Sequence, residues 1–91
     1  MIEGSTLLLQ CVVGNQRGPV QWAKDGFVLG YDRSIPGYPR YSMIGDASLG
    51  VHNLRIVDAK SEDNGEFQCQ VSSYFFVNFI FFIFYNLFFI S

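Results

Sequence analysis

The chain has 91 residues, enough for one domain with its own apolar core. Six basic and eight acidic residues leave a net charge of −2, which gives no reason to expect a nucleic-acid or an anionic-membrane partner. No charged residue follows Glu66, however, and eight of the ten phenylalanines fall between Phe75 and Phe89. The two parts of the chain are therefore interpreted separately.

Alternation of apolar and polar residues predicts a domain built of β-strands, with glycine and proline marking the turns between them. Asp25-Gly26 is a strong hairpin signal, so the chain should return directly after it. In chain order we predict a strand over 6–13, a turn at 15–19, a strand over 20–24, a returning strand over 27–31, an irregular crossing segment over 34–39, and strands through 41–43, 54–56 and 67–71.

Three residues and one short run resemble a known fold. Cys11, Trp22 and Cys69 have the spacing of an immunoglobulin sandwich, and the run 63–69, Asp-Asn-Gly-Glu-Phe-Gln-Cys, resembles its E–F corner. The resemblance implies an all-β, immunoglobulin-like β-sandwich of V/I type with a C′ strand. It also implies a Cys11–Cys69 disulfide with Trp22 packed on it, in an oxidising compartment. The alternative is a pair of free buried thiols in a cytosolic sandwich.

Arg40 and Asp63 fall at positions where such sandwiches often hold an ion pair. Arg40 opens strand D and Asp63 precedes the turn into strand F. The positional match favours a structural ion pair that fixes the corner. In the alternative, both charges are solvated and contribute little.

Two segments resemble one family of receptors more specifically. Residues 20–26 (VQWAKDG) and 36–42 (PGYPRYS) are similar to the first immunoglobulin domain of the nephrin and kirre/roughest (irregular chiasm) cell-adhesion receptors. Residues 2–5 and 69–71 are similar too, so the likeness covers about 2–71. The segment 36–42 resembles the nephrin branch more than the kirre branch.

This resemblance implies an extracellular domain for cell-cell adhesion that binds immunoglobulin domains of nephrin/kirre-type receptors, homophilically or heterophilically. The family uses the outward face of its C–C′–F–G sheet. On strand C′ one of two alternating sets should join that face, Phe27, Leu29 and Tyr31 or Val28 and Gly30. Without the resemblance, the amides on this face are ordinary solvent-facing residues. The candidate protein-binding face consists of Gln21, Ala23, Phe27, Leu29, Gln68 and Gln70.

The sequence predicts no catalytic, cofactor-binding or metal site, and no enzyme. His52 is the only histidine, so no histidine cluster exists for zinc. The acids near the E–F turn are scattered around a corner, and no serine stands in a nucleophile-elbow context.

The end of the chain departs from the family pattern, which continues with strand G. We expect residues 1–71 to form an incomplete immunoglobulin-like domain, with strand A shortened and a regular strand G missing. Residues 72–91 are then a Phe/Ile-rich apolar tail outside the native fold.

Three interpretations of this tail compete. An apolar run of about seventeen residues is at the short limit for a membrane helix, but it lacks flanking Lys or Arg. Its Phe, Ile and Tyr favour a substitute strand, but the residues do not alternate. We favour the third interpretation, a translated intron, because these residues have A/T-rich codons and residues 70–72 can be encoded by a splice-donor-like string.

The parent receptor is expected at the cell surface, with this domain on the extracellular side, although the chain lacks a signal peptide. One functional alternative is a truncated or intron-read-through fragment with no activity of its own. Another is a membrane-anchored immunoglobulin receptor fragment of a different family. Membrane association through residues 74–90 is the less favoured interpretation.

Overall fold

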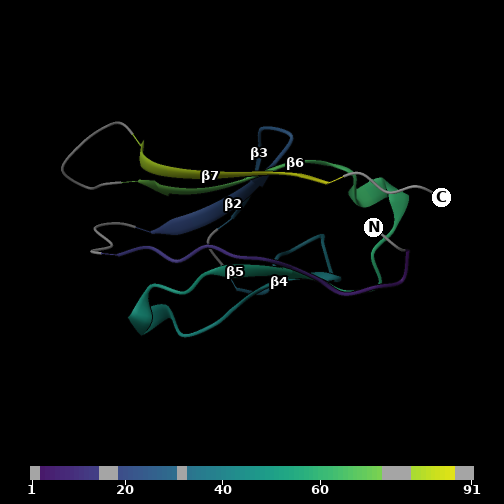
Figure 1. Ribbon diagram of the computed structural model, residues 1–91, viewed down its shortest axis with the longest axis horizontal. Coiled ribbons are helices and arrows are strands. Elements are labelled where there is room, and N and C mark those ends of the chain that lie inside the picture. The colour runs from purple at the N-terminus through teal and green to yellow at the C-terminus, as the bar shows by residue number, and fades with distance from the viewer. Residues whose placement is uncertain (1–2, 15–18, 31–32, 73–78, 88–91) are drawn as a thin grey trace.

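The computed structural model describes residues 3–14, 19–30, 33–72 and 79–87, which form a two-layered β-sandwich (Figure 1). One sheet has three strands in the order β1-β5-β4, and the other has four in the order β3-β2-β6-β7. All pairings are antiparallel. The predicted all-β sandwich is confirmed. The elements are β1 Leu7–Leu9, β2 Val20–Lys24, β3 Phe27–Gly30, β4 Tyr41–Ile44, β5 Asn53–Ile56, β6 Gly65–Ser72 and β7 Phe79–Leu87, with short 3₁₀ helices η1 Ala47–Leu49 and η2 Ser61–Asp63.

The core lies between the two sheets and is centred on a disulfide. Cys11 and Cys69 are bridged, and Trp22 stands directly opposite Cys69 in the β2–β6 ladder. All three side chains are fully buried. The Trp22 Nε1–H donates to the carbonyl oxygen of His52 at 2.8 Å, so the one polar atom of the indole is satisfied by the opposite sheet. The buried residues around this centre are Leu9, Val13, Val20, Leu29, Ile35, Tyr41, Met43, Leu54, Ile56 and Phe67.

The hairpin between β2 and β3 forms at the predicted dipeptide. Asp25 and Gly26 both have positive φ angles, 51° and 85°, as a tight hairpin turn requires. The Asp25 Oδ1 atom accepts a hydrogen bond from the Glu66 amide at 2.9 Å, and the Asp25 amide donates to the Glu66 carbonyl at 2.8 Å. These two bonds tie the hairpin to the beginning of β6.

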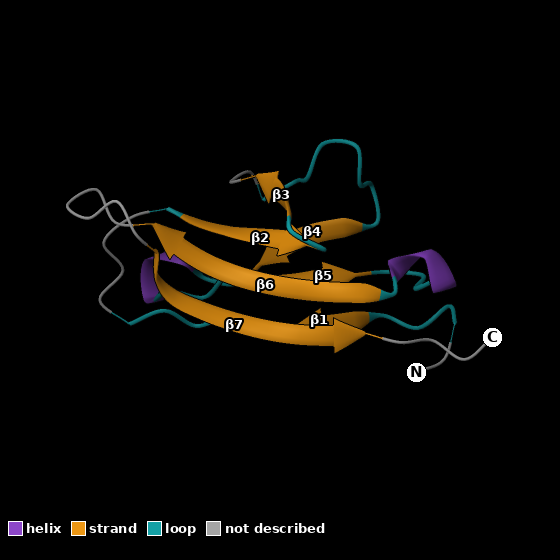
Figure 2. Ribbon diagram, turned by 90° about the horizontal axis from the view of Figure 1, so that it is seen from above, coloured by secondary structure: helices purple, strands orange, loops and turns teal. Residues whose placement is uncertain are grey.

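The end of the chain differs from the sequence prediction. Residues 79–87, expected to lie outside the fold, form β7 and pair with β6 from Gly65↔Leu87 to Ser72↔Phe79. Figure 2 shows β7 running alongside β6. β7 therefore occupies the place where a regular strand G was predicted to be missing. The physical reason is that the open edge of β6 presents unpaired backbone groups, and Phe, Ile and Tyr adopt extended conformations readily.

Some expectations lie partly outside the described residues. They are the turn at 15–18, Tyr31 at the end of the returning strand, and residues 73–78 and 88–91 of the tail. Among the described residues, which begin at Glu3, no strand precedes β1, and Gly4 instead donates a backbone hydrogen bond to Ala59.

Candidate functional site

The corner at η2 is held by a buried carboxylate. Arg40 Nη1 lies 2.6 Å from Asp63 Oδ2 and Arg40 Nη2 lies 2.8 Å from Asp63 Oδ1, so the pair is bidentate. The Asp63 side chain is 2 % exposed and that of Arg40 22 %. The expected ion pair is present, and it carries two further donors: the Tyr41 hydroxyl and the Lys60 amide both donate to the Asp63 carboxylate.

The electrostatics of this corner favour a charged Asp63. Burial raises the pKa of Asp63, but hydrogen bonds from Arg40, Tyr41 and the Lys60 amide outweigh it, so the net pKa is below the usual value. Burial and the bond to Asp63 raise the pKa of Tyr41 well above its usual range. Both groups therefore keep their ordinary ionisation state around neutral pH. These contacts anchor η2.

The candidate protein-binding face lies on the outer side of the β3-β2-β6 sheet. The ladder aligns Gln21 with Gln70 and Ala23 with Gln68, so two uncharged rows cross β2 and β6. The Gln68 Nε2 donates to Gln70 Oε1 at 3.0 Å, which links the two rows. Gln21 and Gln70 are only 6 % exposed, and Gln68 is half-buried.

On β3 the structure corrects the choice between the two alternating sets. Leu29 is 7 % exposed and belongs to the core, so its assignment to the outer face is wrong. Val28 pairs with Ala23 and is 54 % exposed, so it takes the outward position. The cause is the register of the two-residue hairpin, which pairs Ala23 with Val28 and so places both on the outward side. Leu29, the next residue along the strand, therefore faces inward.

Phe27, from the same predicted set as Leu29, lies at the hairpin end of β3. It pairs with Lys24 and is 77 % exposed. Consecutive strand residues point to opposite sides, so Phe27 lies on the side of Lys24 and not with Val28. The open part of the outer face therefore consists of Val28 and Gln68, beside the nearly closed Gln21, Ala23 and Gln70.

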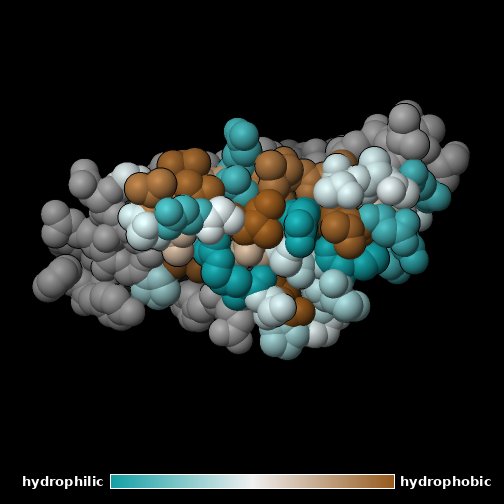
Figure 3. All heavy atoms as spheres, turned by 90° about the horizontal axis from the view of Figure 1, so that it is seen from below, coloured by the Kyte–Doolittle hydropathy of each residue, from teal (hydrophilic) through white to brown (hydrophobic). Residues whose placement is uncertain are grey.

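The outer side of the opposite sheet offers a comparison. Its surface mixes hydrophobic and hydrophilic side chains (Figure 3), among them Leu8 and Val12 with exposures of 48 % and 58 %. Arg55 of β5 is exposed on the same side, where it pairs with Leu8. This surface thus carries a charge at its centre, whereas the aligned pairs Gln21–Gln70 and Ala23–Gln68 carry none. The charged residues of β2 and β6, Lys24 and Glu66, lie at the hairpin end of the sheet.

Metal and membrane sites were also considered. Within residues 3–14, 19–30, 33–72 and 79–87, no group of three or more His, Cys, Asp or Glu side chains is placed to hold a metal ion. The same part of the chain contains no helix long and apolar enough to cross a bilayer.

Comparisons with known proteins place this architecture in a family. The immunoglobulin I-set domain family matches residues 1–76. The structure superposes on the crystal structure of Duf (Kirre) D1 with a TM-score of 0.85 and 35 % identity, covering 92 % of this chain and 80 % of that one. The chain belongs to the immunoglobulin I-set domain family, which is not a family of enzymes.

Two relatives show which members of this family the sequence resembles. The chain is 48 % identical over 71 residues to the synaptogenesis protein syg-1 of Caenorhabditis elegans, covering 76 % of this chain, and 46 % identical over 71 residues to mouse nephrin, covering 78 %. It spans only 10 % and 6 % of those proteins. The resemblance to the nephrin and kirre/roughest adhesion receptors is thus confirmed. Relatives of both branches match, so the preference for the nephrin branch stays a prediction.

Sequence reasoning missed two members of these sites. Val28 was open to assignment, because a two-residue turn at Asp25-Gly26 pairs Ala23 with Val28 and gives both side chains the same side. The Tyr41 hydroxyl bond to Asp63 was open to prediction, because Tyr41 directly follows Arg40 at the start of β4. A tyrosine predicted to face inward needs a partner for its hydroxyl, and the nearby carboxylate supplies one.

Proposed function

We propose that this domain recognises another immunoglobulin domain through the outer face of the β3-β2-β6 sheet, as a cell-adhesion module. The partner is a nephrin/kirre-type first domain, either a copy of this one or that of a related receptor. The parent protein lies at the cell surface with this domain outside, which agrees with the Cys11–Cys69 disulfide.

One observation carries the proposal. A family of adhesion receptors matches the chain, and the β2 and β6 rows align four uncharged residues, Gln21 with Gln70 and Ala23 with Gln68. The centres of protein interfaces are depleted in charge and enriched in aromatic residues. The neighbouring hairpin adds the exposed apolar side chains of Phe27 and Val28.

The accessible geometry indicates how a partner would be held. Gln21 and Gln70 are already nearly closed to solvent, so direct contact falls mainly on Gln68 and Val28, with the exposed Phe27 at the rim of the hairpin. With one amide N–H of Gln68 donated to Gln70, the side chain can still offer its other N–H and its carbonyl oxygen to a polar contact.

The test is direct binding by the oxidised 91-residue chain. Its solution is passed over immobilised first domains of mouse nephrin and human kin of IRRE-like protein 1, and its self-association is followed by analytical ultracentrifugation. We expect saturable binding to at least one domain or reversible dimerisation. Circular dichroism and free-thiol titration first establish that the sample is folded and bridged. A folded chain that binds neither domain and stays monomeric contradicts the proposal and supports the fragment without activity.

A further inference from the structure

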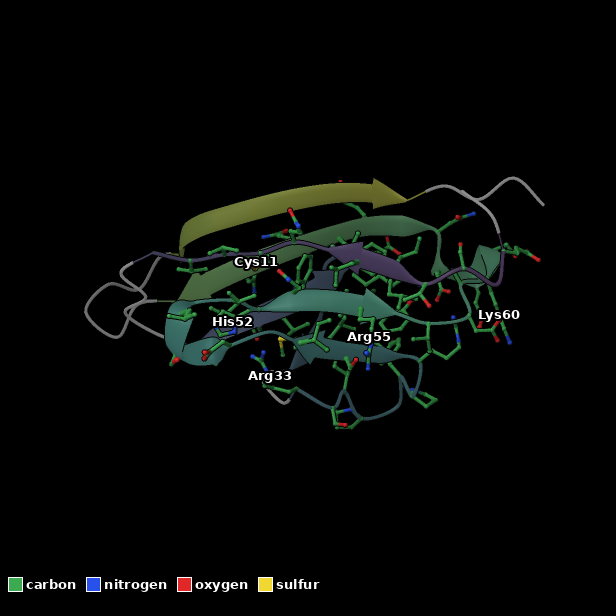
Figure 4. The ribbon with its side chains drawn as sticks, turned by 60° about the horizontal axis from the view of Figure 1, so that its bottom comes forward. Cys11, Arg33, His52, Arg55 and Lys60 are labelled. Carbon is green, nitrogen blue, oxygen red and sulfur yellow. A yellow bond between two sulfur atoms is a disulfide. The ribbon has the colours of Figure 1, made fainter. Side chains whose placement is uncertain are left out.

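His52 sits at a junction between the two sheets. Its side chain is 7 % exposed, its amide donates to the Cys11 carbonyl at 2.8 Å, and its own carbonyl accepts from Trp22 Nε1. The ring contacts a cation: Arg33 Nη1 lies 3.2 Å from His52 Nδ1. Figure 4 shows Arg33 and His52 next to each other, at the end of the sandwich away from Lys60.

This contact defines the protonation state of the ring. A guanidinium group can only donate hydrogen bonds, so Nδ1 must be the acceptor and carry no proton. The imidazole is therefore neutral, with its proton on Nε2. Burial of the ring, and secondly the charge of Arg33, lower the pKa of His52 from its usual value.

The same guanidinium holds the connection between β4 and β5. Arg33 Nη2 donates to the carbonyl of Gly45 at 2.6 Å and to that of Val51 at 3.3 Å, so it ties both ends of residues 45–51 to the His52 ring. The connection is tightly packed. A Cβ atom on Gly45 would lie 2.3 Å from a methyl group of Val51, and one on Gly50 would lie 2.1 Å from the Val13 carbonyl oxygen.

The charge that acts on the His52 ring itself is positive. Arg33 faces the ring itself. Asp46, at the N-terminus of η1, is the nearby acid: its carboxylate accepts from the Ser48 amide and hydroxyl, and its charge acts on Arg33 rather than on the ring. His52 also contacts Trp22 of β2 and Cys11, which follows β1 in the chain. Neither residue is charged.

We propose that the Arg33–His52 contact is an acid-sensitive latch on residues 45–51. Proton uptake at Nδ1 converts the acceptor of the hydrogen bond into a donor and places a second positive charge about 3.2 Å from Arg33. The contact then opens, and the hold of Arg33 on the Gly45 and Val51 carbonyls is lost with it. The sign follows from linkage. Above the ordinary histidine pKa of about 6.5, the latch makes its full contribution to the free energy of unfolding. This contribution is lost as the pH falls through the lower pKa that His52 has in the folded state.

The test uses the fact that His52 is the only histidine of the chain. The ring is titrated by NMR between pH 5 and 8 in the 91-residue chain and in Arg33→Gln, which removes the charge but keeps a donor. We expect a pKa below 6.5 in the parent chain and a rise towards 6.5 in Arg33→Gln. For each unit by which the folded-state pKa of His52 lies below 6.5, protonation of His52 lowers the ratio of folded to unfolded protein about tenfold.

Two further measurements separate a latch from a merely buried ring. In the parent chain the amides of Val51 and His52 should lose protection from hydrogen exchange at pH 5.5 relative to pH 7.5, while the amide of Trp22 keeps it. In His52→Gln, which retains an acceptor for Arg33 without titrating, protection should be equal at both pH values. An unshifted pKa of His52, or the same pH dependence in His52→Gln, overturns the proposal.

Discussion

The corner at η2 and the edge strand β7 are held in place by different kinds of contact. At the corner, one carboxylate accepts from a guanidinium, a hydroxyl and an amide, each at a defined position. β7 is placed by its backbone register with β6, which runs over eight aligned pairs of residues. The first arrangement requires particular side chains, whereas the second requires only a segment able to adopt an extended conformation.

The match to the I-set family also differs between the η2 corner and β7. The I-set family matches residues 1–76, which include the corner but not β7, although the solved Duf (Kirre) D1 structure covers 92 % of the chain. The buried core cluster, within the part of the chain whose side chains are described, lies between Leu9 and Cys69. We propose that residues 1–71 carry the specific part of the fold, and that the tail adds to the sheet through the backbone of Phe79–Leu87.

Loss of the disulfide should have the largest effect on this specific region. Cys69→Ala removes a bridge across 58 residues beneath Trp22 and should lower the free energy of unfolding by about 2–5 kcal/mol. Guanidinium denaturation followed by Trp22 fluorescence measures the change. The parent chain under reducing conditions serves as the control and should lose a similar amount. An unchanged denaturation midpoint would show that the bridge does not stabilise the sandwich.

Removing the cation at the corner should have the next largest effect. Arg40→Met leaves the buried Asp63 charge without its main partner and should cost about 3 kcal/mol at pH 7. Glu62→Gln is the matched control, because Glu62 also contacts Arg40 but its side chain is 71 % exposed, and it should cost under about 0.5 kcal/mol.

The cost of Arg40→Met should also depend on pH. Since the pKa of Asp63 is lowered, the contribution of the pair is present above the ordinary carboxyl pKa of about 4 and is lost as the pH falls through the folded-state value. Denaturation at pH 7 and pH 3 should give a smaller cost at pH 3. Equal costs at both pH values, or equal costs for both variants, would contradict a specific buried pair.

A proline in β7 should have a smaller effect on the same core. Ile83→Pro removes one backbone donor from the edge strand, opposite Cys69, and should cost about 1 kcal/mol, because edge strands tolerate proline better than central ones. Near-UV circular dichroism should show an unchanged environment for Trp22. Ala23→Pro in the central strand β2 is the contrasting variant and should prevent folding. If both variants unfold the domain, β7 is as integral to the fold as β2.

The sequence predicted those parts of the molecule that depend on residue identity. The spacing of Cys11, Trp22 and Cys69 indicated the sandwich, and the positions of Arg40 and Asp63 indicated the corner. It could not predict what depends on backbone geometry. The open edge of β6 decides that residues 79–87 pair with it, and no spacing in the sequence marks that pairing. The choice of Val28 over Leu29, in contrast, follows from the Asp25-Gly26 turn.

The most direct test of the proposed function compares two valines on opposite sheets. Val28 and Val12 are 54 % and 58 % exposed, so lysine at either position should be tolerated by the fold. Binding to the nephrin and kin of IRRE-like first domains is measured for the parent chain, Val28→Lys and Val12→Lys. The account predicts that Val28→Lys weakens binding at least about tenfold, because it places an unpaired charge in the contact, while Val12→Lys stays within about twofold. Equal effects of the two substitutions, or a Val28→Lys variant that binds like the parent chain, would contradict recognition through the β3-β2-β6 face.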